Sequence, residues 1–149
     1  MAETRIPAER KHTDEIAALI ASDSGPRPPG WAMTPKAVLT YVLGSDKPVG
    51  GVKISPKYIG DRAIVEVAVA TLASDRALLL AGEPGTAKSW LSEHLTAAIS
   101  GTSALIVQGT AGTSEEHLKY GWNYALLHTE GPTERALVPL KMWLGKHAS

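Results

Sequence analysis

One stretch, "LLLAGEPGTAKSWLSEHL" from Leu78 to Leu95, constrains the fold of this 149-residue chain more than any other. The apolar run that leads into its glycine-rich part, residues 76–82, is short and ends at a glycine, which predicts a buried parallel strand. Residues 89–100 place their apolar side chains at helical spacing, which predicts an amphipathic helix. A strand, a glycine-rich loop and a helix in this order predict an α/β fold with an anion-binding loop.

The loop has the spacing of a phosphate-binding P-loop: Gly82, four residues, then Ala87, Lys88 and Ser89. Glycine permits tight turns and a close approach of phosphate to the backbone. A lysine at this position is a cation for the β- and γ-phosphates of a nucleotide, and the next hydroxyl is a ligand for Mg²⁺. We therefore expect ATP and Mg²⁺ as ligands, with Ser89 on the metal. The expected nucleotide-binding residues of the loop are Gly82, Glu83, Pro84, Gly85, Thr86, Ala87, Lys88 and Ser89.

Alanine stands at position 87, where this motif usually has glycine. We expect a helical φ at Ala87, which alanine adopts without strain, and so we expect the substitution to be tolerated. The alternative is a plain Gly-Pro turn between a strand and a helix, with Lys88 as a solvated charge.

Other local signals predict further elements on both sides of the loop. Residues 1–12 read as a frayed polar lead, and Thr13 is a candidate cap for a short helix. Thr34 followed by Pro35 predicts a second helix that ends at Gly44. Residues 61–74 fit a strand or a helix, and their length favours a helix. Residues 104–109 predict a second buried strand, and Thr113 with Glu116 has the spacing of a capping box.

Composition excludes several classes of function. Lys+Arg and Asp+Glu are both 15, and this balance argues against a broad nucleic-acid or membrane surface. There is no cysteine, so disulfides, thiol nucleophiles and cysteine-ligated metals are excluded. The chain starts with a charged segment and has no apolar run of signal or membrane-spanning length, so we expect a cytoplasmic protein.

Three longer stretches of the sequence resemble the MoxR-type branch of the AAA+ ATPases. They are "KYIGDRAIVEVAVATLASDRALLL" before the loop, "GEPGTAKSWLSEHL", and "VQGTAGTSEEHLKYGWNYALL" after it. The resemblance covers roughly residues 28–138. It implies a three-layer P-loop NTPase core of AAA+ type over residues 56–149, behind a small helical segment, residues 1–55. It also implies a helix over residues 61–74, with Ile59 and Gly60 near the adenine.

What is known of MoxR-like proteins implies partners as well. They are Mg-ATP-driven ring ATPases with chaperone-like roles, often working with von Willebrand factor A proteins. The resemblance therefore implies a homo-oligomer or an assembly with a full-length relative, and a von Willebrand factor A partner. The charge balance and the lack of a membrane-length apolar run lead us to expect no nucleic acid or membrane partner.

The acidic motif of the family, an Asp for Mg²⁺ and a Glu for water at the end of an apolar strand, is not found. No aspartate follows Lys88, and no later glutamate ends an apolar strand. Residues 140–149 also depart from the family pattern. We therefore expect a truncated or frameshifted product with little hydrolysis of its own, whose two apolar strands lack neighbours and promote association. The alternative is a short protein with a function of its own.

Two other functions stay open: a non-catalytic nucleotide-binding or protein-interaction fragment, and a P-loop kinase, for which no catalytic acid is found. The five histidines lack metal-ligand spacing, and His94 is expected to be a core residue. Tyr120, Trp122 and Tyr124 are conceivable as a nucleobase platform, but core packing is the simpler interpretation.

Overall fold

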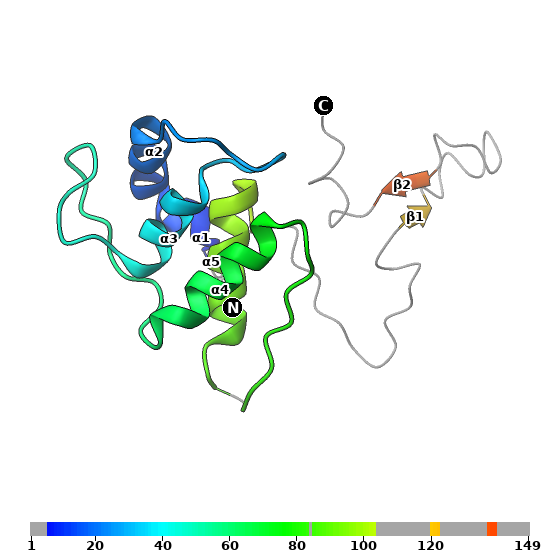
Figure 1. Ribbon diagram of the computed structural model, residues 1–149. Coiled ribbons are helices and arrows are strands. Elements are labelled where there is room, and N and C mark those ends of the chain that lie inside the picture. The colour runs from blue at the N-terminus through cyan, green and yellow to red at the C-terminus, as the bar shows by residue number, and fades with distance from the viewer. Residues whose placement is uncertain (1–5, 84, 104–119, 123–136, 140–149) are drawn as a thin grey trace, which may run out of the picture. The chain divides into compact units, whose positions relative to one another are not determined.

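The computed structural model describes residues 6–83, 85–103, 120–122 and 137–139 (Figure 1). Contacts divide the chain into two units, Met1–Ser103 and Ala104–Ser149. In the second unit, β1 (Tyr120–Trp122) pairs antiparallel with β2 (Leu137–Pro139), with Gly121 opposite Val138. Among the described residues, no helix is both long and apolar enough to cross a membrane.

Helices build the first unit, and local signals in the sequence locate most of them. They are α1 (Ala8–Lys11), α2 (Thr13–Ser22), α3 (Pro35–Leu43), α4 (Arg62–Ala73) and α5 (Lys88–Ser100). Side-chain caps mark the starts of two predicted helices. The Thr34 hydroxyl accepts from the Ala37 N–H at 3.2 Å, and the Asp61 carboxylate accepts from the Ala63 N–H at 2.9 Å. The predicted helix over residues 61–74 is thereby confirmed as α4.

Gly44 ends α3 as predicted, and its conformation explains why glycine stands there. Its φ is +83°, in the left-handed region that residues with a Cβ rarely adopt. A Cβ at this position would lie 2.9 Å from the backbone nitrogen of Pro56. The chain that returns from residues 45–56 therefore packs directly against the end of α3.

The N-terminal prediction was wrong in two respects. Part of the polar lead forms the single-turn helix α1, and Ala8 within it is buried. Thr13 does not cap α2, because α1 runs almost directly into it. The Thr13 hydroxyl instead donates back to the carbonyls of Glu9 and Arg10, at 2.9 and 3.0 Å.

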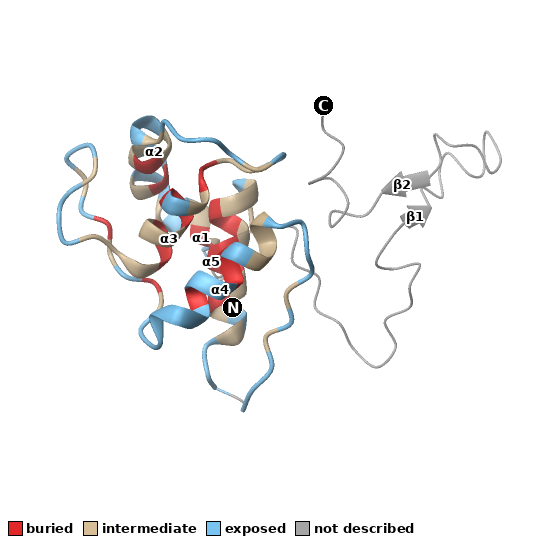
Figure 2. Cartoon of the chain, in the orientation of Figure 1, coloured by how far each residue is buried: buried red, intermediate tan, exposed pale blue. Residues whose placement is uncertain are grey.

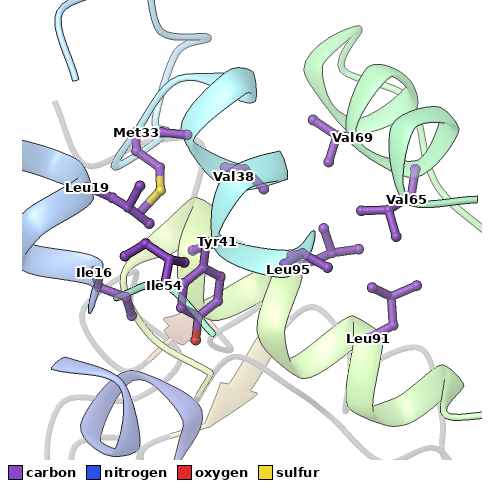
Figure 3. Close-up of a cluster of buried hydrophobic side chains, with 14 residues drawn as sticks. Ile16, Leu19, Met33, Val38, Tyr41, Ile54, Val65, Val69, Leu91 and Leu95 are labelled. Carbon is purple, nitrogen blue, oxygen red and sulfur yellow. The ribbon is translucent and has the colours of Figure 1, made fainter. Parts of the chain in front are cut away.

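The core of the first unit lies between α2, α3, α4 and α5 (Figure 2). Val65 of α4 faces Leu91 and Leu95 of α5, and Val69 lies toward Val38 of α3 (Figure 3). Tyr41 lies fully buried on α3. Because α5 starts immediately after the glycine-rich loop, this packing fixes the direction in which the loop leaves the core.

The predicted buried strand over residues 76–82 is wrong for the described structure. These residues form no strand, and Leu79 is 89% exposed. Leu78 and Leu80 on either side pack against the helical core. A strand needs a hydrogen-bonded neighbour, and none of the described segments pairs with this one. The segment therefore has one face against the helices and one open to solvent.

A buried ion pair joins α2 to the segment before α4. The Lys57 ammonium donates to the Glu15 carboxylate, which also accepts from the Ser55 N–H at 3.0 Å and the Ser55 hydroxyl at 2.9 Å. Burial raises the pKa of Glu15, but the hydrogen bonds from Lys57 and Ser55 outweigh it and the pKa is lowered overall. Burial lowers the pKa of Lys57, and Glu15 opposes this only in part. The pair holds the backbone of residues 55–57 against α2.

Several predictions fall outside the described residues: the second strand over 104–109, the helix start at Thr113 and Glu116, and Tyr124. The α/β core and the division of the chain after residue 55 stay predictions. The described elements are the helices of the first unit and the two-stranded β1–β2 sheet.

Candidate functional site: the loop before α5

Lys88 closes the glycine-rich loop on itself. Its ammonium group donates to the Gly82 carbonyl at 2.8 Å, to the Thr86 hydroxyl at 2.8 Å, and to the Glu83 carbonyl. The Thr86 hydroxyl in turn donates to the Glu83 carbonyl at 2.8 Å. The cation therefore lies beside the backbone of the loop, and an anion held there would meet a positive charge.

The start of α5 adds backbone donors at the same place. The first N–H groups of a helix lack partners within the helix, and the helix dipole is positive at this end. The structure gives α5 no side-chain cap and no acidic residue in its first turn. Ser89 is exposed in that turn. The loop and the helix start thus present the features of a phosphate site, a lysine, a hydroxyl and N-terminal backbone amides.

Two glycines give the loop its path. Gly82 has φ +155° and Gly85 has φ +83°, both in the region where strain disfavours other residues. A Cβ on Gly85 would meet nothing within 4 Å, so its backbone faces open space. Pro84 lies outside the described residues.

The prediction for Ala87 was wrong. Its φ is +58° and its ψ is 20°, which is left-handed and not helical. Ala87 stands at the junction where the loop reverses into α5, and its carbonyl accepts the first helical hydrogen bond, from the Leu91 N–H at 2.9 Å. A left-handed residue with a Cβ is strained by about 1 kcal/mol or more. The glycine usual at this position would relieve that strain.

We therefore expect Ala87→Gly to raise the free energy of unfolding by ~1 kcal/mol, because only glycine adopts this φ without a steric penalty. Chemical denaturation of the two proteins measures the change. Ala70→Gly is the matched control, because Ala70 is exposed inside α4, and we expect it to lose ~1 kcal/mol. If both variants are destabilised equally, Ala87 is helical after all.

Ile59 and Gly60, predicted near the adenine, lie on the short segment between Lys57 and the start of α4. Ile59 is 92% exposed. A Cβ on Gly60 would come within 2.8 Å of the Tyr58 hydroxyl, so a larger residue here would displace that ring. An exposed apolar side chain next to a glycine is compatible with a flat apolar ligand. Among the described residues, no backbone hydrogen bond joins Ile59 or Gly60 to the loop itself.

Trp90 connects two predicted subsites, the phosphate loop of residues 82–89 and the adenine segment of Ile59 and Gly60. The sequence analysis did not predict this connection. Its indole N–H donates to the Lys57 carbonyl at 2.7 Å, two residues before Ile59. The helical spacing of apolar residues over 89–100 predicts only that Trp90 lies on the apolar face of this helix. The signal that sequence offered was a tryptophan in the first turn after the loop, a residue whose N–H usually finds a partner when buried.

His94 is a core residue, as predicted. It is buried, and its Nδ1 lies 3.1 Å from the Tyr41 hydroxyl. Its ring contacts Trp90, with the ring centroids 4.6 Å apart. Among the described residues, no group of three His, Cys, Asp or Glu side chains is arranged to hold a metal ion.

Comparisons with known proteins bear on the same segment. Residues 77–143 match the AAA domain (dynein-related subfamily), a match that starts just before the loop. The chain is also similar to Uncharacterized protein YehL of Escherichia coli (strain K12), 46% identical over 141 residues. That alignment covers 95% of this chain but 38% of the relative, so the chain spans about two fifths of the relative's length. No solved structure gives a significant match. The domain match implies a P-loop NTPase fold and supports a nucleotide-binding AAA+ ATPase domain over residues 77–143.

Proposed function

We propose that this chain binds Mg-ATP, with residues 82–89 around the phosphates and Ile59 and Gly60 beside the adenine. The observation that carries the proposal is the position of Lys88. Its ammonium group contacts three groups of the loop, so the positive charge lies where the phosphates would bind. The start of α5, without a side-chain cap, contributes backbone donors. The match to the AAA domain supports the same ligand class.

Mg²⁺ fits the residues of this site. Mg²⁺ keeps several waters and is usually bound through few protein oxygens together with the phosphates of a nucleotide. The Ser89 hydroxyl, exposed at the first turn of α5, would be the protein ligand here. The metal would neutralise charge on the phosphates and orient them against the loop.

The test is titration of Mg-ATP into wild type and Lys88→Ala by calorimetry. We expect the variant to bind on the order of 100-fold more weakly, because it loses charge-assisted hydrogen bonds to phosphate. Lys53→Ala is the control, because Lys53 is exposed on the segment before Ile54, and we expect it to bind like wild type. Equal affinity in wild type and Lys88→Ala would rule out the phosphate-loop assignment.

We propose further that the isolated 149-residue chain hydrolyses little ATP. P-loop catalysis depends on positioning and on a metal-holding acid, and no aspartate follows Lys88 in the sequence. A phosphate-release assay on the same samples tests this. Sustained release that Lys88→Ala abolishes would show that another acid completes the site.

The resemblance to MoxR-like proteins is the support for the finer part of the proposal. It suggests a chaperone-like role in the cytoplasm, in a ring of AAA+ subunits or with a full-length relative, and a von Willebrand factor A partner. The alternative is a non-catalytic nucleotide-binding or protein-interaction module. Sedimentation with and without Mg-ATP separates them, because a ring subunit is expected to assemble when the nucleotide is bound.

A further inference from the structure

Trp90 makes a hydrogen bond between the helix that follows the phosphate loop and the segment that leads to Ile59 and Gly60. It is in the first turn of α5, two residues after Lys88. Its indole N–H reaches across to the Lys57 carbonyl at 2.7 Å. One side chain therefore ties the helix that follows the phosphate loop to the segment that carries Ile59 and Gly60.

The acceptor of this hydrogen bond is itself anchored to the core. The backbone N–H groups of Lys57 and Tyr58 both donate to the Val42 carbonyl, at 2.8 and 3.2 Å. The Lys57 ammonium is held by Glu15 in the buried ion pair. On the far side of Ile59 and Gly60, the Asp61 carboxylate caps α4. The two residues proposed for the adenine thus span a short bridge with both ends held.

The donor is oriented as firmly as the acceptor. The Trp90 ring packs on the His94 ring at an angle of 60°. His94 is buried and hydrogen-bonded to Tyr41 of α3. The Lys11 ammonium lies 5.7 Å from the centre of the Trp90 ring, on the side of α1. These contacts restrict the rotation of the indole, so its N–H is directed at the Lys57 carbonyl before any ligand arrives.

We propose that Trp90 is a positioning residue that sets the spacing between the adenine segment and the phosphate loop. This inference rests on the proposed binding of ATP. A ligand with base and phosphates bridges both subsites, so it requires them at one separation. If the link between them is cut, only a fraction of the free protein has the binding-competent separation, and the apparent affinity falls by that fraction. A ligand with phosphates alone does not depend on the separation.

The experiment compares two ligands, Mg-ATP and Mg-tripolyphosphate, by calorimetry on wild type, Trp90→Phe, Trp31→Phe and Lys88→Ala. Phenylalanine keeps an aromatic ring against His94 and removes the N–H donor. We expect Trp90→Phe to bind ATP about fivefold more weakly, the effect of one lost hydrogen bond, with unchanged affinity for tripolyphosphate. Trp31, on the loop before α3, packs against the core, and its variant is expected to match wild type with both ligands.

The outcomes separate the inference from the function on which it rests. If wild type binds neither ligand, both fail. If Lys88→Ala loses both ligands but Trp90→Phe binds ATP like wild type, ATP binding stands and the positioning role is overturned. An equal loss of both ligands in Trp90→Phe also overturns it, because Trp90 would then only support the loop.

A second variant guards against misfolding of Trp90→Phe. Replacement of Trp90 by 3-benzothienylalanine keeps the size and shape of the indole and substitutes sulfur for the N–H. We expect the same selective loss of ATP affinity, with a thermal midpoint like that of wild type. If this variant binds both ligands like wild type, the hydrogen bond to Lys57 does not set the spacing.

Discussion

Glu15→Ala is expected to lower the free energy of unfolding by about 3 kcal/mol, because it leaves the buried Lys57 ammonium without its partner. The side chain of Lys57 is buried, and its ammonium group lies over the Tyr41 ring, 4.5 Å from the ring centre. The two hydrogen bonds from Ser55 to the carboxylate are lost as well. Urea denaturation at neutral pH measures the effect.

Glu66→Ala is the matched control, because Glu66 makes an ion pair of the same kind with Arg62 on the exposed face of α4. Exposed pairs contribute little, so we expect a change of at most about 1 kcal/mol. The double variant Glu15→Ala/Lys57→Met is expected to recover part of the loss, since no charge is then buried. Equal effects of Glu15→Ala and Glu66→Ala would mean that the Glu15–Lys57 pair is solvated.

From the same ion pair we predict how the free energy of unfolding depends on pH in the acid range. The pKa of Glu15 is lowered in the folded state from 4.5. Its stabilising contribution is therefore fully present above pH 4.5 and is lost as the pH falls through the folded-state pKa. Glu15→Ala is expected to lack this part of the acid dependence, which denaturation at several pH values between neutral and strongly acidic would measure.

Leu95→Ala is expected to cost about 2–5 kcal/mol, because it opens a cavity between α3, α4 and α5. Leu95 is 2% exposed, and Figure 3 shows it below Val38 of α3 and directed toward Val65 of α4. The measurement is the free energy of unfolding from denaturant titration.

Leu79→Ala is the matched control, since it removes the same atoms from a side chain that is 89% exposed. We expect a change within about 0.5 kcal/mol. A loss as large as that of Leu95→Ala would show that residues 76–82 are covered on both faces, as the sequence had predicted for a buried strand.

Local signals in the sequence were enough to locate most helices of the first unit. They also point to the candidate loop, whose role as a phosphate site stays a prediction. The caps at Thr34 and Asp61 and the stop at Gly44 act over a few residues, so the sequence contains the whole physical cause. The spacing from Gly82 to Ser89 belongs to the same class, because a phosphate loop is defined by consecutive residues. His94 was placed in the core from the periodicity of α5 alone.

Only the tertiary structure decided the features that join distant segments. Trp90 and Lys57 are 33 residues apart, and Glu15 and Lys57 are 42 apart. No local pattern specifies which distant carbonyl or cation meets a side chain, since the packing of several helices sets it. The apolar run at 76–82 has the composition of a strand, but a strand exists only where a neighbour supplies its hydrogen bonds. Ala87 is left-handed where the loop meets α5, a conformation that the intrinsic preference of alanine does not predict.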